Sequence, residues 1–143
     1  MKKIGIIMTF VALFAATSCG TLSNVSDTAA ATSGTACARA LVSLRASQKA
    51  GTLSVTNVSD ISNMLIVINA YNTLKANKGN NNFRKSFAAG MVAGGSGIIT
   101  NSNVNTIINV LLATNGLGTL NSNNISSSNN STQTFSTVLD TMK

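Results

Sequence analysis

The side chains that could take part in chemistry are few in this chain of 143 residues. It contains no histidine and no glutamate, and its acidic side chains are three aspartates, Asp27, Asp60 and Asp140. Without histidine there is no Ser-His or Cys-His nucleophile pair and no imidazole ligand for zinc. Paired-carboxylate catalysis would need two of three aspartates that lie far apart in the sequence. A Ser-Lys pair stays open in principle, but no Ser-x-x-Lys motif occurs. We therefore expect a protein that is not an enzyme and that holds no metal or other cofactor.

The first 19 residues, MKKIGIIMTFVALFAATSC, have the layout of an export signal. Two lysines precede an apolar run from Ile4 to Ala16, and small residues follow as far as Cys19. This order is typical of a secretory signal peptide. The apolar run is shorter than the roughly 20 residues that cross a bilayer as a helix. The sequence therefore predicts a signal peptide over residues 1–18 and an exported protein.

The residues Ala16-Thr17-Ser18-Cys19 resemble the lipobox of bacterial lipoproteins. In that family the thiol is diacylated, the chain is cut before the cysteine, and the new amino terminus is acylated. The family more often carries leucine at the position of Ala16. The resemblance implies that Cys19 is lipidated and that the mature protein sits on a membrane without spanning it, because two or more acyl chains make anchoring stable. Gly20 and Thr21 lack the aspartate that resembles an inner-membrane retention signal, which favours the outer membrane.

The alternatives for Cys19 are an ordinary secretory signal with a chance cysteine or a buried amino-terminal helix. If Cys19 is acylated, the second cysteine, Cys37, has no partner within the chain. Two interpretations of Cys37 stay open. It is either a small buried hydrophobe on a helix, or it forms a disulfide between two molecules in an oxidising compartment.

Basic residues outnumber acidic ones. Without Lys2 and Lys3 of the signal, eight basic residues remain against three aspartates, a surplus of five positive charges. Four of the eight gather near the middle of the chain: Lys75, Lys78, Arg84 and Lys85. Such a patch can hold an acidic envelope protein, an anionic lipid or a glycolipid phosphate, and solvated surface is the simpler alternative. Nucleic acid is not an expected partner, because the chain is exported and its mature part has few aromatic side chains.

The domain that carries these residues is expected to be all-α. Residues 20–34 lack an apolar period, so residues 19–34 are interpreted as the lipidated cysteine followed by a flexible tether. Residues 35–143 then form the domain. Apolar spacing and cap residues predict helices over 35–50, 59–74, 82–93, 102–115 and 131–143, with a mobile polar loop at 115–130. We expect a small bundle of about five helices.

Within this bundle the segment 59–74 has the widest apolar stripe and is expected to be the central helix. A β-strand at 64–68 is the rival interpretation there, because β-branched residues cluster in it. Gly51 is placed where a left-handed C-terminal cap belongs. The spacing of Gly90 and Gly94 allows close packing of two helix backbones, either inside the domain or in a membrane.

The two halves of the domain resemble each other when the chain is shifted by about 43 residues. Leu44 then pairs with Phe87, Ser59 with Ser102, and the pair Met64-Leu65 with Ile107-Ile108. Either two helical hairpins arose by duplication and are closed by the last helix, or the Ala, Ser and Asn bias of the sequence produces the matches by chance.

From these observations we expect a lipid-anchored envelope protein that acts as a structural or protein-binding module. The alternative is a membrane-active protein that inserts its glycine-rich and apolar helices, 82–93 and 102–115, into the bilayer.

Overall fold

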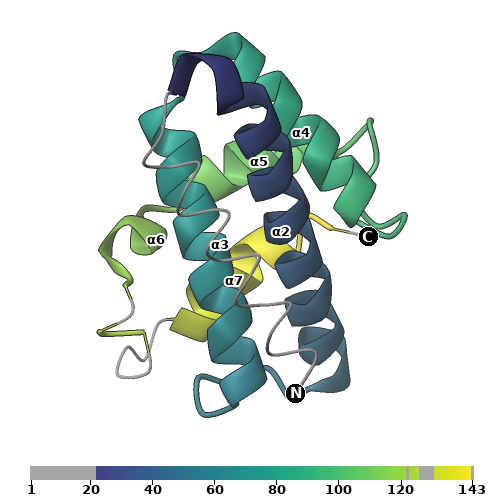
Figure 1. The fold of residues 1–143 in the computed structure, drawn as a ribbon. Coiled ribbons are helices and arrows are strands. Elements are labelled where there is room, and N and C mark those ends of the chain that lie inside the picture. Colours follow the sequence, from purple (N-terminus) through teal and green to yellow (C-terminus); the bar gives the residue numbers. More distant parts are fainter. Residues whose placement is uncertain (1–21, 122, 126–130, 143) are drawn as a thin grey trace, which may run out of the picture.

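The computed structural model of the chain describes residues 22–121, 123–125 and 131–142; of residues 22–27 and Asn115 only the backbone is described. Within these ranges the fold consists of six helices and no strand (Figure 1). The all-α prediction is confirmed, and the strand interpretation of 64–68 is wrong. The helices are α2 (Leu22–Ala50), α3 (Val58–Ala76), α4 (Asn81–Gly94), α5 (Val104–Ala113), α6 (Asn115–Thr119) and α7 (Ser131–Leu139).

The helix α2 corrects the prediction of a flexible tether. It begins at Leu22 rather than at 35, so most of the segment assigned to the tether is helical. Ala30, Ser33 and Gly34 within that segment are buried. The segment shows no apolar stripe because it is packed through small residues, and alanine has the highest helix propensity of all residues. Residues 22–34 therefore belong to the helical domain and not to a tether.

Three glycines let α2 and α4 approach to backbone contact. A Cβ atom added to Gly34 would lie 2.1 Å from the carbonyl oxygen of Phe87, and one added to Gly90 would lie 2.1 Å from that of Ala31. At Gly94 the corresponding distance, to the carbonyl oxygen of Thr35, is 2.6 Å. Real Cβ atoms do not come so close to a carbonyl oxygen, so only glycine fits at these three positions.

The same contact includes a hydrogen bond between the helices. The Thr35 hydroxyl lies 2.9 Å from the Ala31 carbonyl of its own helix and 3.1 Å from the Gly90 carbonyl of α4. Of the two interpretations of the Gly90–Gly94 spacing, close packing inside the domain is the one that this structure contains. The α2–α4 contact is also the most extensive one in the bundle, which makes α2 rather than α3 the central helix.

The turn between α2 and α3 follows the local signals in the sequence. Gly51 has a φ of 76° and ends α2, as predicted, while Thr52 donates its N–H to the Ser47 carbonyl at 2.9 Å. The N-cap of α3 is Asn57, whose side chain accepts from the Ser59 N–H at 3.0 Å. The cap therefore lies before both Ser59 and Asp60, the two candidates that the sequence offers, since asparagine is as good an N-cap as serine.

A buried carboxylate joins α3 to α2 beside this turn. Asp60 is 1 % exposed and accepts the Ser47 hydroxyl at 2.8 Å and the Ser54 N–H at 3.0 Å. It lies in the first turn of α3, where the unpaired N–H groups of the helix stabilise a negative charge. The apolar stripe of α3 is buried as predicted at its main positions, but Ile66 is 39 % exposed and does not widen the stripe. The buried members are Met64, Val67, Ile68, Tyr71 and Leu74.

The last part of the chain closes the core. Leu117, Leu120 and Ile125 are buried, and α6 covers 115–119, so the described part of 115–130 is a packed segment and not the predicted mobile loop. The Ser131 hydroxyl donates to the Ile125 carbonyl at 2.9 Å and holds the start of α7 to this segment. The predicted docking of the last helix is confirmed. Its buried apolar side chains are Phe135, Val138 and Leu139, and Met142, which follows the helix, is buried as well.

The two halves of the proposed repeat agree in structure at the starts of α3 and α5 but not at the contact between α2 and α4. The Asn57 carbonyl accepts from Ile61 N–H and the Thr100 carbonyl from Val104 N–H, and these positions are equivalent at the shift of 43. The glycines of the α2–α4 contact are not equivalent, because the same shift pairs Gly90 with Ser47. This contact therefore lacks the two-fold symmetry that a pair of duplicated hairpins predicts.

Candidate functional site

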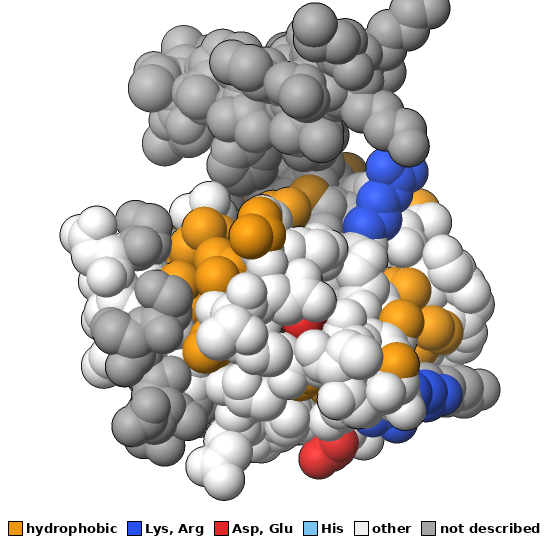
Figure 2. Space-filling model, turned by 90° about the horizontal axis from the view of Figure 1, so that it is seen from below, with side chains coloured by type: hydrophobic (Ala, Val, Ile, Leu, Met, Phe, Trp, Pro, Cys, Tyr) orange, Lys and Arg blue, Asp and Glu red, His pale blue; other side chains and the backbone are white. Residues whose placement is uncertain are grey.

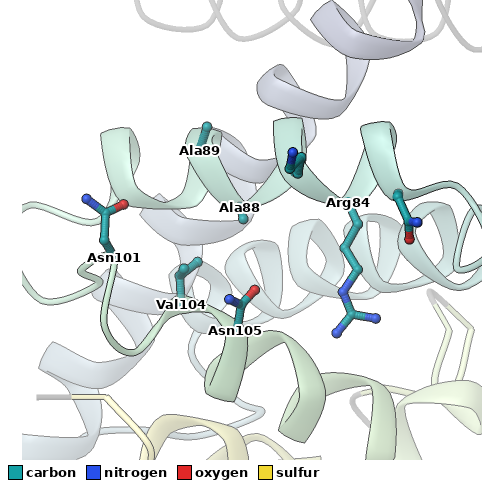
Figure 3. A pocket seen from close by; sticks show the side chains of 8 residues that line it. Arg84, Ala88, Ala89, Asn101, Val104 and Asn105 are labelled. Carbon is teal, nitrogen blue, oxygen red and sulfur yellow. The ribbon is translucent and has the colours of Figure 1, made fainter.

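An open cleft of about 560 Å³ lies between α4 and the start of α5 (Figure 3). Its volume falls within the range of small-ligand sites. Two cationic side chains, three carboxamides and three small apolar side chains line it: Arg84, Lys85, Asn81, Asn101, Asn105, Ala88, Ala89 and Val104.

The two faces of α4 explain why these side chains meet. One face carries Phe87, Gly90 and Gly94, which pack against α2 or the core. The residues that line the cleft follow the opposite face at helical spacing, as Asn81, Arg84, Lys85 and Ala88 do. The helix begins at a well-defined position, because the Asn80 side chain accepts the Phe83 N–H at 3.0 Å. The close packing of one face of α4 against α2 thus determines that the opposite face lines the cleft.

The opposite wall of the cleft is formed where the chain enters α5. Asn101 precedes the helix, and Val104 and Asn105 belong to its first turn (Figure 3). The Asn103 side chain stabilises the turn before the helix, since its oxygen accepts the Thr100 N–H at 2.6 Å and its nitrogen donates to the Ile98 carbonyl at 3.2 Å. Asn101 and Asn105 are exposed and remain available to a ligand.

The charge of the cleft is positive. Arg84 donates to the Asn109 side chain of α5, and Lys85 is exposed. None of the carboxylates whose side chains are described lines the cleft. Asp60 is occupied by Ser47 and Ser54, and Asp140 lies 3.7 Å from Arg45. Two cations with amide donors beside them can hold a phosphate, a carboxylate or another anionic oxygen group.

The four basic residues predicted from the sequence divide into two pairs. Arg84 and Lys85 line the cleft, whereas Lys75 and Lys78 do not. The Lys75 ammonium lies 5.8 Å from the centroid of the Tyr71 ring, at the distance of a cation–π contact. Lys78 is exposed in the turn between α3 and α4. Asn81, Asn101 and Asn105 could not be predicted from the sequence, because asparagine is abundant throughout the chain and carries no period of its own.

The structure bears on one of the two cysteines. Cys19 lies outside the described residues. Cys37 is fully buried on α2, and burial raises the pKa of its thiol from 9.0 to about 12. A disulfide between molecules would require α2 to leave the core, so the structure favours the interpretation of Cys37 as a small buried hydrophobe.

Among the described residues no group of three or more potential metal ligands comes together. In the same part of the chain, none of the helices has the length and apolarity needed to traverse a bilayer. Comparison with models of known protein families, with characterised proteins and with solved structures finds no match for this chain. The site therefore has to be interpreted from its own geometry.

Proposed function

We propose that this protein is a lipoprotein of the bacterial outer membrane whose helical domain serves as a binding module. The observation that carries the proposal is the order of residues 1–19, in which two lysines, an apolar run and Ala16-Thr17-Ser18-Cys19 follow one another. Two or more acyl chains on this cysteine would hold the domain on the membrane surface.

The binding role is supported by the cleft between α4 and α5. It brings two cations and three carboxamides together without a nucleophile–base pair beside them, and this set suits recognition better than catalysis. The expected partner is an acidic group of an envelope protein or of an anionic lipid or glycolipid. Arg84 and Lys85 would make the charged contacts and the asparagine side chains the neutral hydrogen bonds.

The anchor is tested by mass spectrometry of the protein made in a two-membrane bacterium. We expect the wild-type chain to begin at Cys19 with fatty acyl chains attached and to enter the detergent-rich phase on phase partition. The Cys19→Ser variant should lose the acyl mass, while the matched variant Cys37→Ala should keep it. A wild-type chain with a bare Cys19 thiol would contradict the proposal.

The binding role is tested by crosslinking in intact membranes followed by isolation of the protein. We expect a partner to be recovered with the wild type and lost with the double variant R84Q/K85Q. The double variant R39Q/K49Q removes the same charge from two exposed positions of α2, which does not line the cleft, and should keep the partner. Equal recovery with both double variants would count against the cleft.

A competing proposal is that α4 and α5 enter the bilayer. Such insertion would have to open the α2–α4 contact, in which Gly90 and Gly94 lie against the backbone of α2. Leakage from lipid vesicles separates the two proposals. A binding module leaves vesicles intact, whereas release of an enclosed dye by the Cys19→Ser chain would favour insertion.

A further inference from the structure

Basic side chains are unevenly distributed between the two ends of the bundle. Lys75, Lys78, Arg84 and Lys85, which we call the basic end, lie at the end of α3, in the following turn and at the start of α4. Figure 1 shows that this is also the end at which α2 begins. Asp27 is the acidic residue in the first two turns of α2, so the sequence gives this end four basic residues against one acidic residue.

The helix contacts establish this arrangement independently of any view. Gly90 lies against Ala31 and Gly94 against Thr35, so α4 and α2 run in the same direction where they cross. Arg84 and Lys85, one to two turns before Gly90, therefore lie toward the start of α2. In contrast, Ser47 of α2 binds Asp60 at the start of α3, so α3 runs back along α2 and carries Lys75 to the same end.

The opposite end is close to neutral. Arg45 and Lys49 lie there together with Asp60 and Asp140, and Arg45 is 3.7 Å from Asp140. Figure 2, which views the bundle from that end, shows both acidic and basic side chains among mostly uncharged ones. The surplus charge of the domain is therefore concentrated at the end where α2 starts.

This end is also the one closest to the proposed lipid. The helix α2 begins at Leu22, three residues after Cys19. Three residues reach at most about 10 Å when fully extended. A domain joined so closely to an acylated cysteine cannot be lifted clear of the headgroups, so the side chains around the start of α2 must lie near them.

We infer that the basic end rests on the membrane that holds Cys19, with the phosphates of anionic lipids in that membrane as its partner. The inference builds on the proposed lipid anchor and adds an orientation to it. Acyl chains and a cluster of basic residues are two membrane signals that reinforce each other. Each basic side chain near an anionic surface strengthens the contact about fivefold.

The orientation can be measured with the full lipidated chain and fluorescent labels at its two ends. Gly79→Cys places a thiol at the basic end in open space, and Thr52→Cys places one at the far end, where residue 52 is exposed. Cys37 does not interfere, because its thiol is fully buried. Each labelled protein is reconstituted into phosphatidylcholine vesicles with or without phosphatidylglycerol, together with a lipid that carries a quencher on its headgroup.

We expect strong quenching of the Gly79 label on the anionic vesicles and weak quenching of the Thr52 label. The variant K78Q/K85Q should reduce the Gly79 quenching on anionic vesicles to the level seen with phosphatidylcholine alone. The variant R39Q/K49Q removes the same charge away from the basic end and should leave the quenching unchanged. All four side chains are exposed, so both variants should fold, which circular dichroism verifies.

Equal quenching of the two labels, or an equal effect of the two double variants, would overturn the orientation. Quenching of the Gly79 label that does not depend on phosphatidylglycerol would contradict anionic lipid as the partner of the basic end; shielding of this label in intact envelopes but not on vesicles would point instead to an acidic protein. The acyl mass of each preparation is measured first. Absence of acyl mass overturns the anchor, whereas lipidated protein without a preferred end overturns the orientation alone.

Discussion

The two halves of α2 are held by opposite kinds of contact. Around Gly34 the backbone of α2 lies directly on the backbone of α4, with no side chain between them. Around Ser47 the helix is joined to α3 through a hydroxyl group and the buried Asp60 carboxylate. The first contact requires that Gly34 and Gly90 have no Cβ atom, and the second requires the Ser47 hydroxyl and the Asp60 carboxylate to be paired.

This difference determines how each half should respond to substitution. An added methyl group harms the glycine contact through overlap, because the two backbones must move apart. Removing the Asp60 carboxylate harms the polar contact, because its half-buried partners lose their hydrogen-bond acceptor. One substitution at each contact tests this difference, and two further substitutions, one between the contacts and one at the surface, sharpen it.

The largest effect is expected for Gly90→Ala. The new Cβ would lie 2.1 Å from the Ala31 carbonyl oxygen, so α4 must shift away from α2, and we expect a loss of about 3 kcal/mol in the free energy of unfolding. Urea unfolding followed by circular dichroism measures it. Gly79→Ala is the control, since nothing lies within 4 Å of the new methyl group, and it should change stability by less than about 0.5 kcal/mol. Equal stability of the two variants would refute the backbone contact.

The second effect is expected for Asp60→Ala. It leaves the Ser47 hydroxyl and the Ser54 N–H without their acceptor in a buried setting, at a cost of about 2 kcal/mol. Asp60→Asn should cost less, because one side-chain oxygen remains as an acceptor. Thermal unfolding of both variants provides the measurement, and a larger loss for asparagine than for alanine would be inconsistent with this role.

The third effect concerns Cys37, which lies on α2 between the two contacts. Burial raises its pKa to about 12, so near pH 10 the unfolded chain releases the thiol proton while the folded chain keeps it. The stability is therefore complete below about pH 9 and falls as the pH rises toward 12, by about 1.4 kcal/mol per pH unit. Comparing urea unfolding of wild type and Cys37→Ala across this range isolates the effect, because the two proteins differ only at this side chain. A parallel pH dependence of the two proteins would contradict it.

The smallest effect is expected for Asp140→Ala, at the surface beside the second half of α2. Its carboxylate lies 3.7 Å from Arg45 and accepts from Gln48 at 3.1 Å, but the side chain is 68 % exposed. An exposed ion pair of this kind contributes up to about 0.5 kcal/mol and is screened by salt. The free energies of unfolding of wild type and Asp140→Ala should differ slightly at low salt and agree at high salt. A loss as large as that of Asp60→Ala would contradict the assignment of this contact as a weak surface ion pair.

The elements that the sequence predicted well are those with one apolar face. In α3, Met64, Ile68 and Leu74 recur at helical spacing and are buried, and the last helix docks through Phe135 and Val138 in the same way. The C-terminal cap of α2 was also predictable, since a glycine after an apolar stripe indicates a left-handed cap and Gly51 provides it. These signals are local, because water on one side and the core on the other impose the helical period on the chain itself.

The site was predictable in part for the same reason. Arg84 and Lys85 are neighbours in sequence, so they necessarily lie near each other, and both line the cleft. Lys75 belongs to another helix and contacts Tyr71 instead. Asn101 and Asn105 join the site from across the cleft, and nothing in their spacing relates them to Arg84.

The sequence by itself determined that the chain is helical, where most helices end, and which faces of α3, α5 and α7 are buried. The tertiary structure decided the full length of α2, the backbone contact at Gly34 and Gly90, and the meeting of α4 with α5 around the cleft. The physical reason is that an apolar stripe records only that a face avoids water. A contact that depends on missing Cβ atoms leaves no such period. Its two sides are also far apart in the chain: Thr35 and Gly90, which are joined by a hydrogen bond at this contact, are separated by 55 residues.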